Sequence, residues 1–600
     1  SNTKQDHWHF VNVKYDTDVK RRKIFRRIVV GPHERLRTAA ERVAMLDLEA
    51  MPKTLFGLDA LAIQTVHDDA FDVEAVTEQF FGHYQVVFDQ LQKDLRKQTR
   101  DAEWAHAYAL QFLNRLMFLY FIQRKRWLGD DPDFVCDFWG TYKKAGTPKD
   151  SFYRDWLSVL FFEAFNNQFQ AGRSDRKHLP KKYLDALALA PYLNGGLFSE
   201  NGLDKKHVVK IGDGIFVALF DRFDNQAPGF FERYNFTIRE DSPFDQEVAV
   251  DPEMIGKVYE SLVNVTSEGV EEVDQRGNAG IVYTPRIEID LMCRLALVDY
   301  LANHLGEKFK PLLYDAVFAY EDADKQAADK ALARENLWKP INELLRKLTA
   351  CDPACGSGSF IVGMLMVVDD LQARANMQLG IEETTYQSRK RIIGQSLYGV
   401  DVMDWAVRTA ELRLWLQLIV ETDLDAAEMK MQPLLPNLSF KLRVGDSLVQ
   451  QVGGIIFNVD REHLTIPAPL KRKLTALKEE KLKFYNDVRS SKFKSEEAVR
   501  KEELNIFREI LDTRADDLDK RIRELKRDIA KPPEQMSLLG MESPKAAEQL
   551  DLFMKQKRED LETAQGELAE VESGRAALRT AQVVPFVWDI AFVEIFEDDE

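Results

Sequence analysis

The sequence predicts an α/β fold preceded by a mainly helical domain, with a long antiparallel helical hairpin inserted into it. Three observations support this prediction. A glycine-rich turn separates a short apolar run from a helical one near residues 350–368, apolar side chains follow helical spacing over residues 35–130, and leucines recur every seventh residue from Leu504. With 600 residues, 45% hydrophobic and 30% charged, the chain is long enough to form several cores.

The first 34 residues predict a β-hairpin. Trp8–Tyr15 and Lys23–Val30 are rich in β-branched and aromatic residues, and a polar turn over 16–18 joins them. Residues 35–250 are predicted to form a helical domain. Within it, residues 107–127 are apolar on nearly all sides, which is typical of a helix at the centre of a bundle.

The glycine-rich turn runs from Asp352 to Phe360, as Asp-Pro-Ala-Cys-Gly-Ser-Gly-Ser-Phe. It lies between two apolar runs, Leu344–Leu348 and Ile361–Val368, and we predict a strand before the turn and a helix that begins at Ser359. Glycines without a Cβ can take positive φ and let the backbone lie directly against a ligand. The sequence therefore predicts a ligand at the N-terminus of this helix.

The amino-acid sequence of this turn resembles the first cofactor motif of the γ-type S-adenosylmethionine-dependent DNA adenine-N6 methyltransferases. Three other segments agree with that family in their order: Tyr283-Thr284-Pro285 upstream, and Tyr398-Gly399-Val400-Asp401-Val402 and Gly445-Asp446-Ser447 downstream. The resemblance implies a Rossmann-like class I methyltransferase core over residues 251–460 with S-adenosylmethionine as its cofactor. The cofactor-binding residues that it implies are Tyr283, Thr284, Pro285, Asp352, Pro353, Ala354, Gly356, Gly358, Phe360, Asp401, Val402, Asp446 and Ser447.

In this resemblance the Asp352–Gly358 loop holds the methionine moiety, Asp401 the ribose and Asp446 the adenine. Each residue also has a plainer interpretation. Thr284 and Pro285 suit the entry of a helix, and both aspartates suit ordinary turns.

One spacing departs from the expected pattern. An acidic residue usually follows the glycines by about 20 residues, whereas Asp401 comes much later, so we interpret residues 371–395 as an inserted or lengthened crossover helix. A nicotinamide-dependent dehydrogenase is the rival enzyme, but it requires a third glycine where Ile361 stands.

The resemblance also implies a catalytic Asn/Asp-Pro-Pro-Tyr/Phe loop, and no Asn-Pro-Pro or Asp-Pro-Pro occurs in the sequence. Residues 583–600 resemble the return to the core just before that loop. We therefore assign no catalytic residue and expect this chain to be the inactive N-terminal part of a longer enzyme. In that enzyme, double-stranded DNA would be bound mainly by a domain beyond residue 600. The resemblance extends to Type IIG-like restriction-modification and phage-defence enzymes. Many of these carry a nuclease domain at their N-terminus, which allows residues 1–34 to be the tail of an upstream nuclease-like domain.

Residues 461–582 predict an antiparallel coiled-coil hairpin inserted into the core. Leu504, Leu511, Leu518 and Leu525 form the heptad series, Pro532-Pro533 ends the first helix, and a second helix spans 546–578. Such a hairpin suits a spacer, a surface for a protein partner or an arm along DNA.

Within the predicted methyltransferase core, Trp405–Leu418 is predicted to form an amphipathic helix, with Arg408 and Arg413 facing solvent.

The net charge of −17 argues against a uniformly basic DNA-binding surface, although it allows one local basic face.

No apolar run approaches the roughly 20 residues of a membrane span and no signal peptide opens the sequence. These features predict a cytoplasmic protein without a membrane partner. Four scattered cysteines predict reduced thiols and no metal site. The alternative function is a non-catalytic coiled-coil assembly or DNA-scaffold protein that retains a methyltransferase-like fold.

Overall fold

The computed structural model of this chain divides into two units, residues 1–442 and 443–600, and each is described by itself. The structure describes residues 8–15, 23–31, 36–49, 51, 59–193, 197–198, 200–222, 228–236, 245–247, 250, 254, 256, 284–420, 428–431, 434, 438, 440–449, 451–452, 455–456, 468–485, 491–493, 496–530, 544–580 and 586–596. The domain boundaries given above stay predictions.

The predicted N-terminal hairpin is confirmed. Strands β1 (Trp8–Tyr15) and β2 (Lys23–Val30) pair antiparallel, with Trp8 opposite Val30. A third strand that we did not predict, β3 (Asp245–Glu247), pairs parallel with β2. Its three residues are all polar, so no apolar alternation marks them as a strand.

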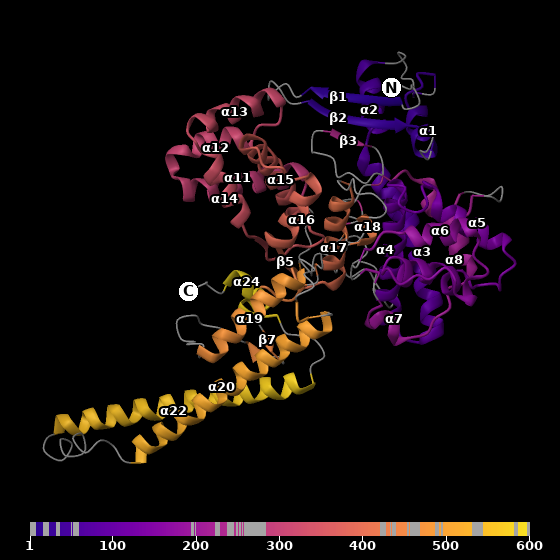
Figure 1. The fold of residues 1–600 in the computed structure, drawn as a ribbon. Helices are drawn as coiled ribbons and strands as arrows, with labels where there is room; N and C mark the ends of the chain where they lie inside the picture. Colours follow the sequence, from indigo (N-terminus) through magenta and orange to yellow (C-terminus); the bar gives the residue numbers. More distant parts are fainter. Residues whose placement is uncertain are drawn as a thin grey trace. The chain divides into compact units, whose positions relative to one another are not determined.

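Helices make up most of the rest of the region before residue 250 (Figure 1). They are α1 (Leu36–Ala44), α2 (Ala60–Ala70), α3 (Val73–Thr99), α4 (Ala102–Arg124), α5 (Phe134–Lys144), η1 (Tyr153–Leu157), η2 (Val159–Ala164), η3 (Ser174–Arg176), α6 (Lys181–Leu189), α7 (Gly202–Lys206), α8 (Asp213–Phe220) and η4 (Phe230–Arg233). The α4 helix is buried along nearly all of its length, as predicted, and the Asp101 side chain caps it by accepting a hydrogen bond from the Trp104 backbone N–H.

A polar residue on a fully buried helix needs a partner. Arg115 of α4 has one, because its guanidinium forms a two-pronged ion pair with Asp204, with N···O distances of 2.7 and 2.8 Å. Its Nε also donates to the Leu197 carbonyl oxygen. This pair fixes α4 to the start of α7 inside the core.

The α/β part begins with four helices and a short 3-10 turn: α11 (Arg286–Leu305), η5 (Glu307–Phe309), α12 (Lys310–Val317), α13 (Asp322–Arg334) and α14 (Trp338–Lys347). It continues as β4 (Ala350–Asp352), α15 (Ser359–Leu379), α16 (Thr385–Gln395), β5 (Leu397–Asp401), α17 (Asp404–Val420), α18 (Glu428–Met431) and β6 (Leu442–Val444). The strand order is β4-β5-β6, and β4 runs parallel to β5 with Asp352 opposite Gly399. A larger Rossmann-like sheet stays a prediction.

The predicted strand at Leu344–Leu348 was wrong in its position. Residues 344–347 form the last turn of α14, and the strand is Ala350–Asp352. Ile341 and Leu345 are both buried and lie four residues apart, so the helical period continues through this apolar run.

The late position of Asp401 has a structural cause. Two helices, α15 and α16, stand between β4 and β5 where a single crossover helix is usual. The Thr384 side chain starts α16 in a capping box with Gln387, so the second helix has its own N-terminal signal.

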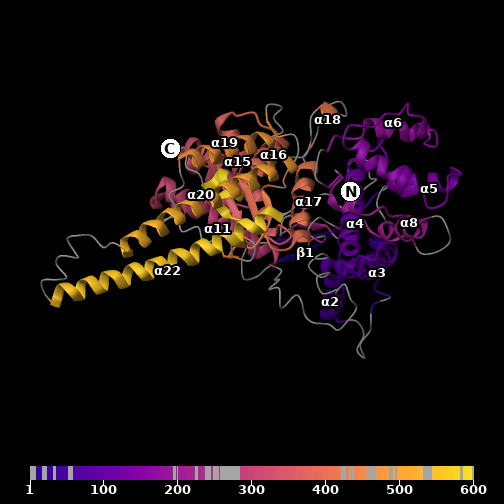
Figure 2. The same ribbon diagram turned by 90° about the horizontal axis from the view of Figure 1, so that it is seen from below.

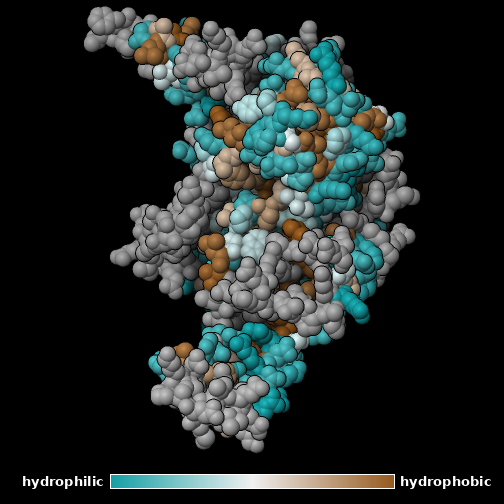
Figure 3. Space-filling model, turned by 90° about the vertical axis from the view of Figure 1, so that its left-hand side faces the viewer, coloured by the Kyte–Doolittle hydropathy of each residue, from teal (hydrophilic) through white to brown (hydrophobic). Residues whose placement is uncertain are grey.

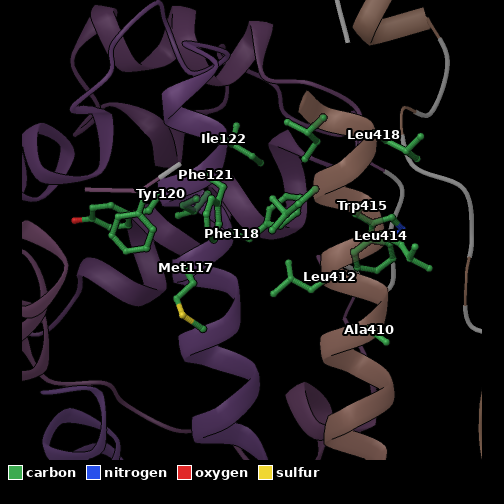
Figure 4. Close-up of a cluster of buried hydrophobic side chains, with 14 of the residues drawn as sticks. Met117, Phe118, Tyr120, Phe121, Ile122, Ala410, Leu412, Leu414, Trp415 and Leu418 are labelled. Carbon is green, nitrogen blue, oxygen red and sulfur yellow. The ribbon is translucent and has the colours of Figure 1, made fainter. Parts of the chain in front are cut away.

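Arg413 does not face solvent, contrary to our prediction, and is only 2% exposed. The cause is that α17 is buried on almost every side, because it packs against α4 as well as against the sheet. Figure 4 shows Phe118 and Ile122 of α4 on the side that faces α17, with Leu412 of α17 pointing toward α4. One hydrophobic core therefore runs through both parts of the first unit.

The second unit contains β7 (Gln451–Val452), β8 (Ile455–Ile456), α19 (Ala468–Tyr485), α20 (Glu496–Ala530), α22 (Pro544–Thr580), α23 (Trp588–Ala591) and α24 (Val593–Phe596). The two long helices α20 and α22 lie side by side in both views (Figures 1 and 2). Ion pairs join Asp512 to Arg575 and Asp528 to Lys557, at 2.7 and 3.0 Å, so the two helices run antiparallel. The predicted helix pair is confirmed, while its supercoiling stays a prediction.

On the face drawn in Figure 3, hydrophilic residues predominate among the coloured ones, and hydrophobic residues form small separate patches. Within the described residues, we find no helix with the length and apolar character that a bilayer crossing requires. The same residues contain no group of three or more His, Cys, Asp or Glu side chains arranged to hold a metal ion.

Candidate cofactor-binding site

The glycine-rich turn joins the end of β4 to the start of α15. Gly356 has φ +51° and Gly358 has φ +85°, a region that L-residues with side chains rarely occupy. A Cβ on Gly358 would lie 2.8 Å from the Ala410 Cβ of α17, whereas one on Gly356 would meet no atom of the described chain within 4 Å. Gly358 therefore allows close packing, and Gly356 borders open space.

Asp401, at the end of β5, ties this turn to the neighbouring strand. One carboxylate oxygen accepts a hydrogen bond from the Gly356 backbone N–H at 2.9 Å, and the other accepts from the Met403 N–H at 2.9 Å. The Cys355 N–H also donates to the Val400 carbonyl oxygen at 2.8 Å. Each carboxylate oxygen has a second lone pair, so Asp401 can hold the turn and still accept a hydrogen bond from a ligand.

Asp352, at the end of β4, has an unusual carboxylate. Its Oδ1 accepts from the Ala354 N–H at 3.1 Å, but its Oδ2 is buried and has no hydrogen-bond partner among the described residues. Burial raises the pKa of this carboxyl, the hydrogen bond from Ala354 opposes the rise, and the charge of Asp401 adds to it. A buried acceptor without a partner suits a cationic or hydrogen-bond-donating ligand.

Arg413 supports the turn from α17. Its guanidinium donates to the Ser357 carbonyl oxygen at 3.0 Å and to the Ser359 hydroxyl at 2.9 Å. Gly256 packs against the same residue, since a Cβ there would lie 2.6 Å from the Ser357 Oγ. We did not predict either residue at the site; the one sequence signal was a glycine within a helical pattern, which often marks a close approach.

The upstream segment is only partly described. Tyr283 lies outside the described residues, while Thr284 and Pro285 directly precede α11, and Pro285 occupies the N-cap position. The α11 helix packs closely on α15: a Cβ on Gly363 would lie 2.6 Å from Ile289. Segments around residues 284 and 358 are thus linked through these two helices.

The remaining predicted site residues differ in exposure. Pro353, Ala354 and Val402 are exposed, with Val402 at 57%, and Phe360 is half-buried. In the second unit, Asp446 is exposed and accepts hydrogen bonds from the Leu448 and Val449 N–H groups, both at 2.9 Å, which makes it a turn residue.

Ser447, also in the second unit, is half-buried, and its carbonyl oxygen accepts from the Trp588 indole N–H at 3.0 Å. A Cβ on Gly445 would lie 2.3 Å from the Phe586 Cβ, so this turn packs tightly against the segment before α23.

Comparisons with known proteins bear on this site. Residues 325–449 match the family model of the MmeI DNA-methyltransferase domain. A predicted type II restriction enzyme and methyltransferase of Methanocaldococcus jannaschii is 31% identical over 353 residues, which are 57% of this chain and 27% of the relative. The chain thus spans about a quarter of that relative's length. The match to the methyltransferase domain includes the turn, Asp401 and Asp446.

Among solved structures, the Type IIL restriction-modification enzyme MmeI in complex with DNA is similar over 58% of this chain and 36% of its own, with 17% identity and a TM-score of 0.35. The family model and the archaeal relative agree with the resemblance to DNA methyltransferases that the sequence carries.

Proposed function

We propose that this chain, which carries an MmeI-type DNA-methyltransferase domain, is the S-adenosylmethionine-binding part of a DNA adenine-N6 methyltransferase from a restriction-modification or phage-defence system. One observation carries the proposal. Within the matched segment, the Asp401 carboxylate binds the Gly356 backbone N–H and so joins the glycine turn to the next strand. Double-stranded DNA is the proposed substrate.

The residues present fit the cofactor. S-adenosylmethionine carries a sulfonium and an ammonium group, and the unpartnered Asp352 Oδ2 together with Asp401 offers negative charge at the turn. Open space beside Gly356 allows a ligand to approach the backbone. The bound cofactor would supply an electrophilic methyl group. The chain's own residues bind and orient, and we assign none of them to catalysis.

Three different ligands distinguish this function from its rivals. S-adenosylmethionine and S-adenosylhomocysteine should raise the unfolding temperature of residues 1–600, because a ligand at 100 times its Kd stabilises the folded state by about 2.7 kcal/mol. NAD should have no effect. Stabilisation by NAD alone would indicate a dehydrogenase, and stabilisation by none of the three would favour a scaffold that retains only the fold.

Cofactor binding should weaken as the pH falls from 7 to 5. The pKa of Asp352 is raised by burial, so its carboxyl takes up a proton at a higher pH than an ordinary aspartate and then loses its attraction for a cation. The cofactor's own amino group stays charged over this range, because α-amino groups titrate near pH 8.

Calorimetry at several pH values tests this prediction. In Asp352→Asn, overall binding should be weaker and the decline toward pH 5 should disappear. Asp370→Asn, which lies on α15 and away from the turn, serves as the control and should keep the parent's pH profile. A parent profile that is flat between pH 7 and 5 contradicts the role given to Asp352.

A further inference from the structure

The hairpin of α20 and α22 has its charges separated along its length. Its far end, where α20 finishes and α22 begins, we call the basic end, and we define it as residues 520–530 and 544–558. This end carries Lys520, Arg521, Arg523, Lys526, Arg527, Lys545, Lys555, Lys557 and Arg558 against Glu524, Asp528, Glu548 and Asp551. The other half is acidic, with Glu496, Glu497, Glu502, Glu503, Glu509, Asp512, Asp516, Asp517, Asp519, Glu559, Asp560, Glu562, Glu567, Glu570 and Glu572 against Arg500, Lys501, Arg508, Arg514, Arg575 and Arg579.

Charges in the acidic half partly neutralise one another across the two helices. Arg575 pairs with Asp512 at 2.7 Å, and Arg514 pairs with Glu567 at 2.9 Å. In the basic end, Lys557 pairs across with Asp528, and no other ion pair between the two helices is found there among the described residues.

Most of the cations in the basic end are exposed and can contact an external anion. Arg521, Lys526, Arg527, Lys555 and Arg558 are exposed, and they form no ion pair within the described part of the chain. Lys520 has only a 3.4 Å contact with Asp517 of its own helix.

The basic residues lie away from the contact between the two helices. On α20 the buried positions are Leu518, Ile522 and Leu525, and at 3.6 residues per turn Lys520, Arg523 and Arg527 share the side opposite to them. On α22, the same geometry places Lys555 on the side opposite Ala564, which is buried against α20.

The packing between the helices fixes the backbone that carries these cations. Ile522 and Leu525 of α20 pack with Ala564 of α22, and Leu561 and Leu568 lie against them. Arg523 and Arg527 stand four residues apart, a spacing at which like charges repel. Bound anions would relieve that repulsion.

We infer that the basic end of the hairpin binds the phosphate backbone of double-stranded DNA without reading its sequence. Lys520 and Arg527 are seven residues apart, or about 10 Å along the helix, and a DNA strand presents a phosphate every 3.4 Å or so of axis. A stretch of this length passes about three phosphates. Because the whole chain has a net charge of −17, binding of a polyanion requires such a local cationic surface. The choice of DNA over other polyanions rests on the proposed function.

The test is the salt dependence of duplex binding by residues 1–600, measured by fluorescence anisotropy with a mixed-sequence DNA duplex. For Lys526→Gln/Arg527→Gln, the slope of log K against log salt concentration should become less negative by about 2, since each lost phosphate contact removes about one counterion. Lys501→Gln/Arg579→Gln removes two exposed charges from the other half of the same helices and should leave the slope unchanged.

Three outcomes would overturn the inference: an unchanged slope in the Lys526/Arg527 variant, an equal change in the control, or a loss confined to duplex RNA. Circular dichroism confirms that both variants stay helical. Stabilisation by S-adenosylmethionine, measured on the same proteins, separates the two claims. If it is absent while the DNA slope depends on Lys526 and Arg527, the proposed function fails and the DNA-binding role of the hairpin stands.

Discussion

Replacing Gly356 with leucine is expected to abolish binding of S-adenosylmethionine while the protein stays folded. An added side chain meets no described atom within 4 Å of its Cβ, so it would extend into the space that we assign to the cofactor. The cost to stability is limited to a positive φ of 51°, about 1–2 kcal/mol for a residue with a side chain. Affinity should fall by more than 100-fold, or about 2.7 kcal/mol.

The matched control is Gly380→Leu. Gly380 caps the C-terminus of α15, has φ +65° and also borders open space, so it carries the same backbone cost at the far end of the same helix. Calorimetry should find parent-like binding in this variant and none in Gly356→Leu. Equal affinity in the two variants would show that the space beside Gly356 does not hold the cofactor.

Replacing Gly358 with alanine is expected to destabilise the protein by about 3 kcal/mol. The residue has φ +85°, and the new Cβ would lie 2.8 Å from the Ala410 Cβ and 3.1 Å from its Cα, so α15 and α17 must move apart. Backbone strain costs about 1–2 kcal/mol, and overpacking in a tight core costs a further 1–3 kcal/mol.

Urea unfolding measures this difference, and Gly380→Ala again provides the comparison. That variant has similar backbone strain but no close atom, so it should lose only the backbone cost of about 1–2 kcal/mol. If both alanine variants lose the same free energy, the close approach of α15 and α17 at Gly358 contributes nothing to stability.

Sequence reasoning was most successful where one local signal decides the structure. The β-branched runs of the N-terminal hairpin, the apolar surface of α4 and the start of α15 at Ser359 were predicted correctly for this reason. The glycines of the turn and Asp401 could be brought together because parallel strands place their carboxyl ends at one edge of a sheet. The structure places Gly356 and Asp401 in direct hydrogen-bond contact.

The features that were missed depend on tertiary contacts. Arg413 appears from its helix alone to be a surface residue, and only the packing of α17 against α4 makes it a buried support for Ser357. Gly256 carries no local signal of the residue that it approaches, some hundred positions later in the chain. β3 is three polar residues long and acquires its pairing from β2. Such contacts join distant segments, and periodicity in a single sequence does not report them.

Isothermal titration calorimetry of residues 1–600 with S-adenosylmethionine near pH 7 tests whether the glycine-rich turn binds this cofactor. We predict saturable heat with one cofactor bound per chain, and loss of that heat in both Gly356→Leu and Asp401→Ala. Asp401→Ala removes the acceptor that holds the Gly356 N–H, and circular dichroism should show its helices intact. No binding heat from the parent chain, or the same heat from the parent and both variants, would contradict the assignment of this turn as the cofactor site.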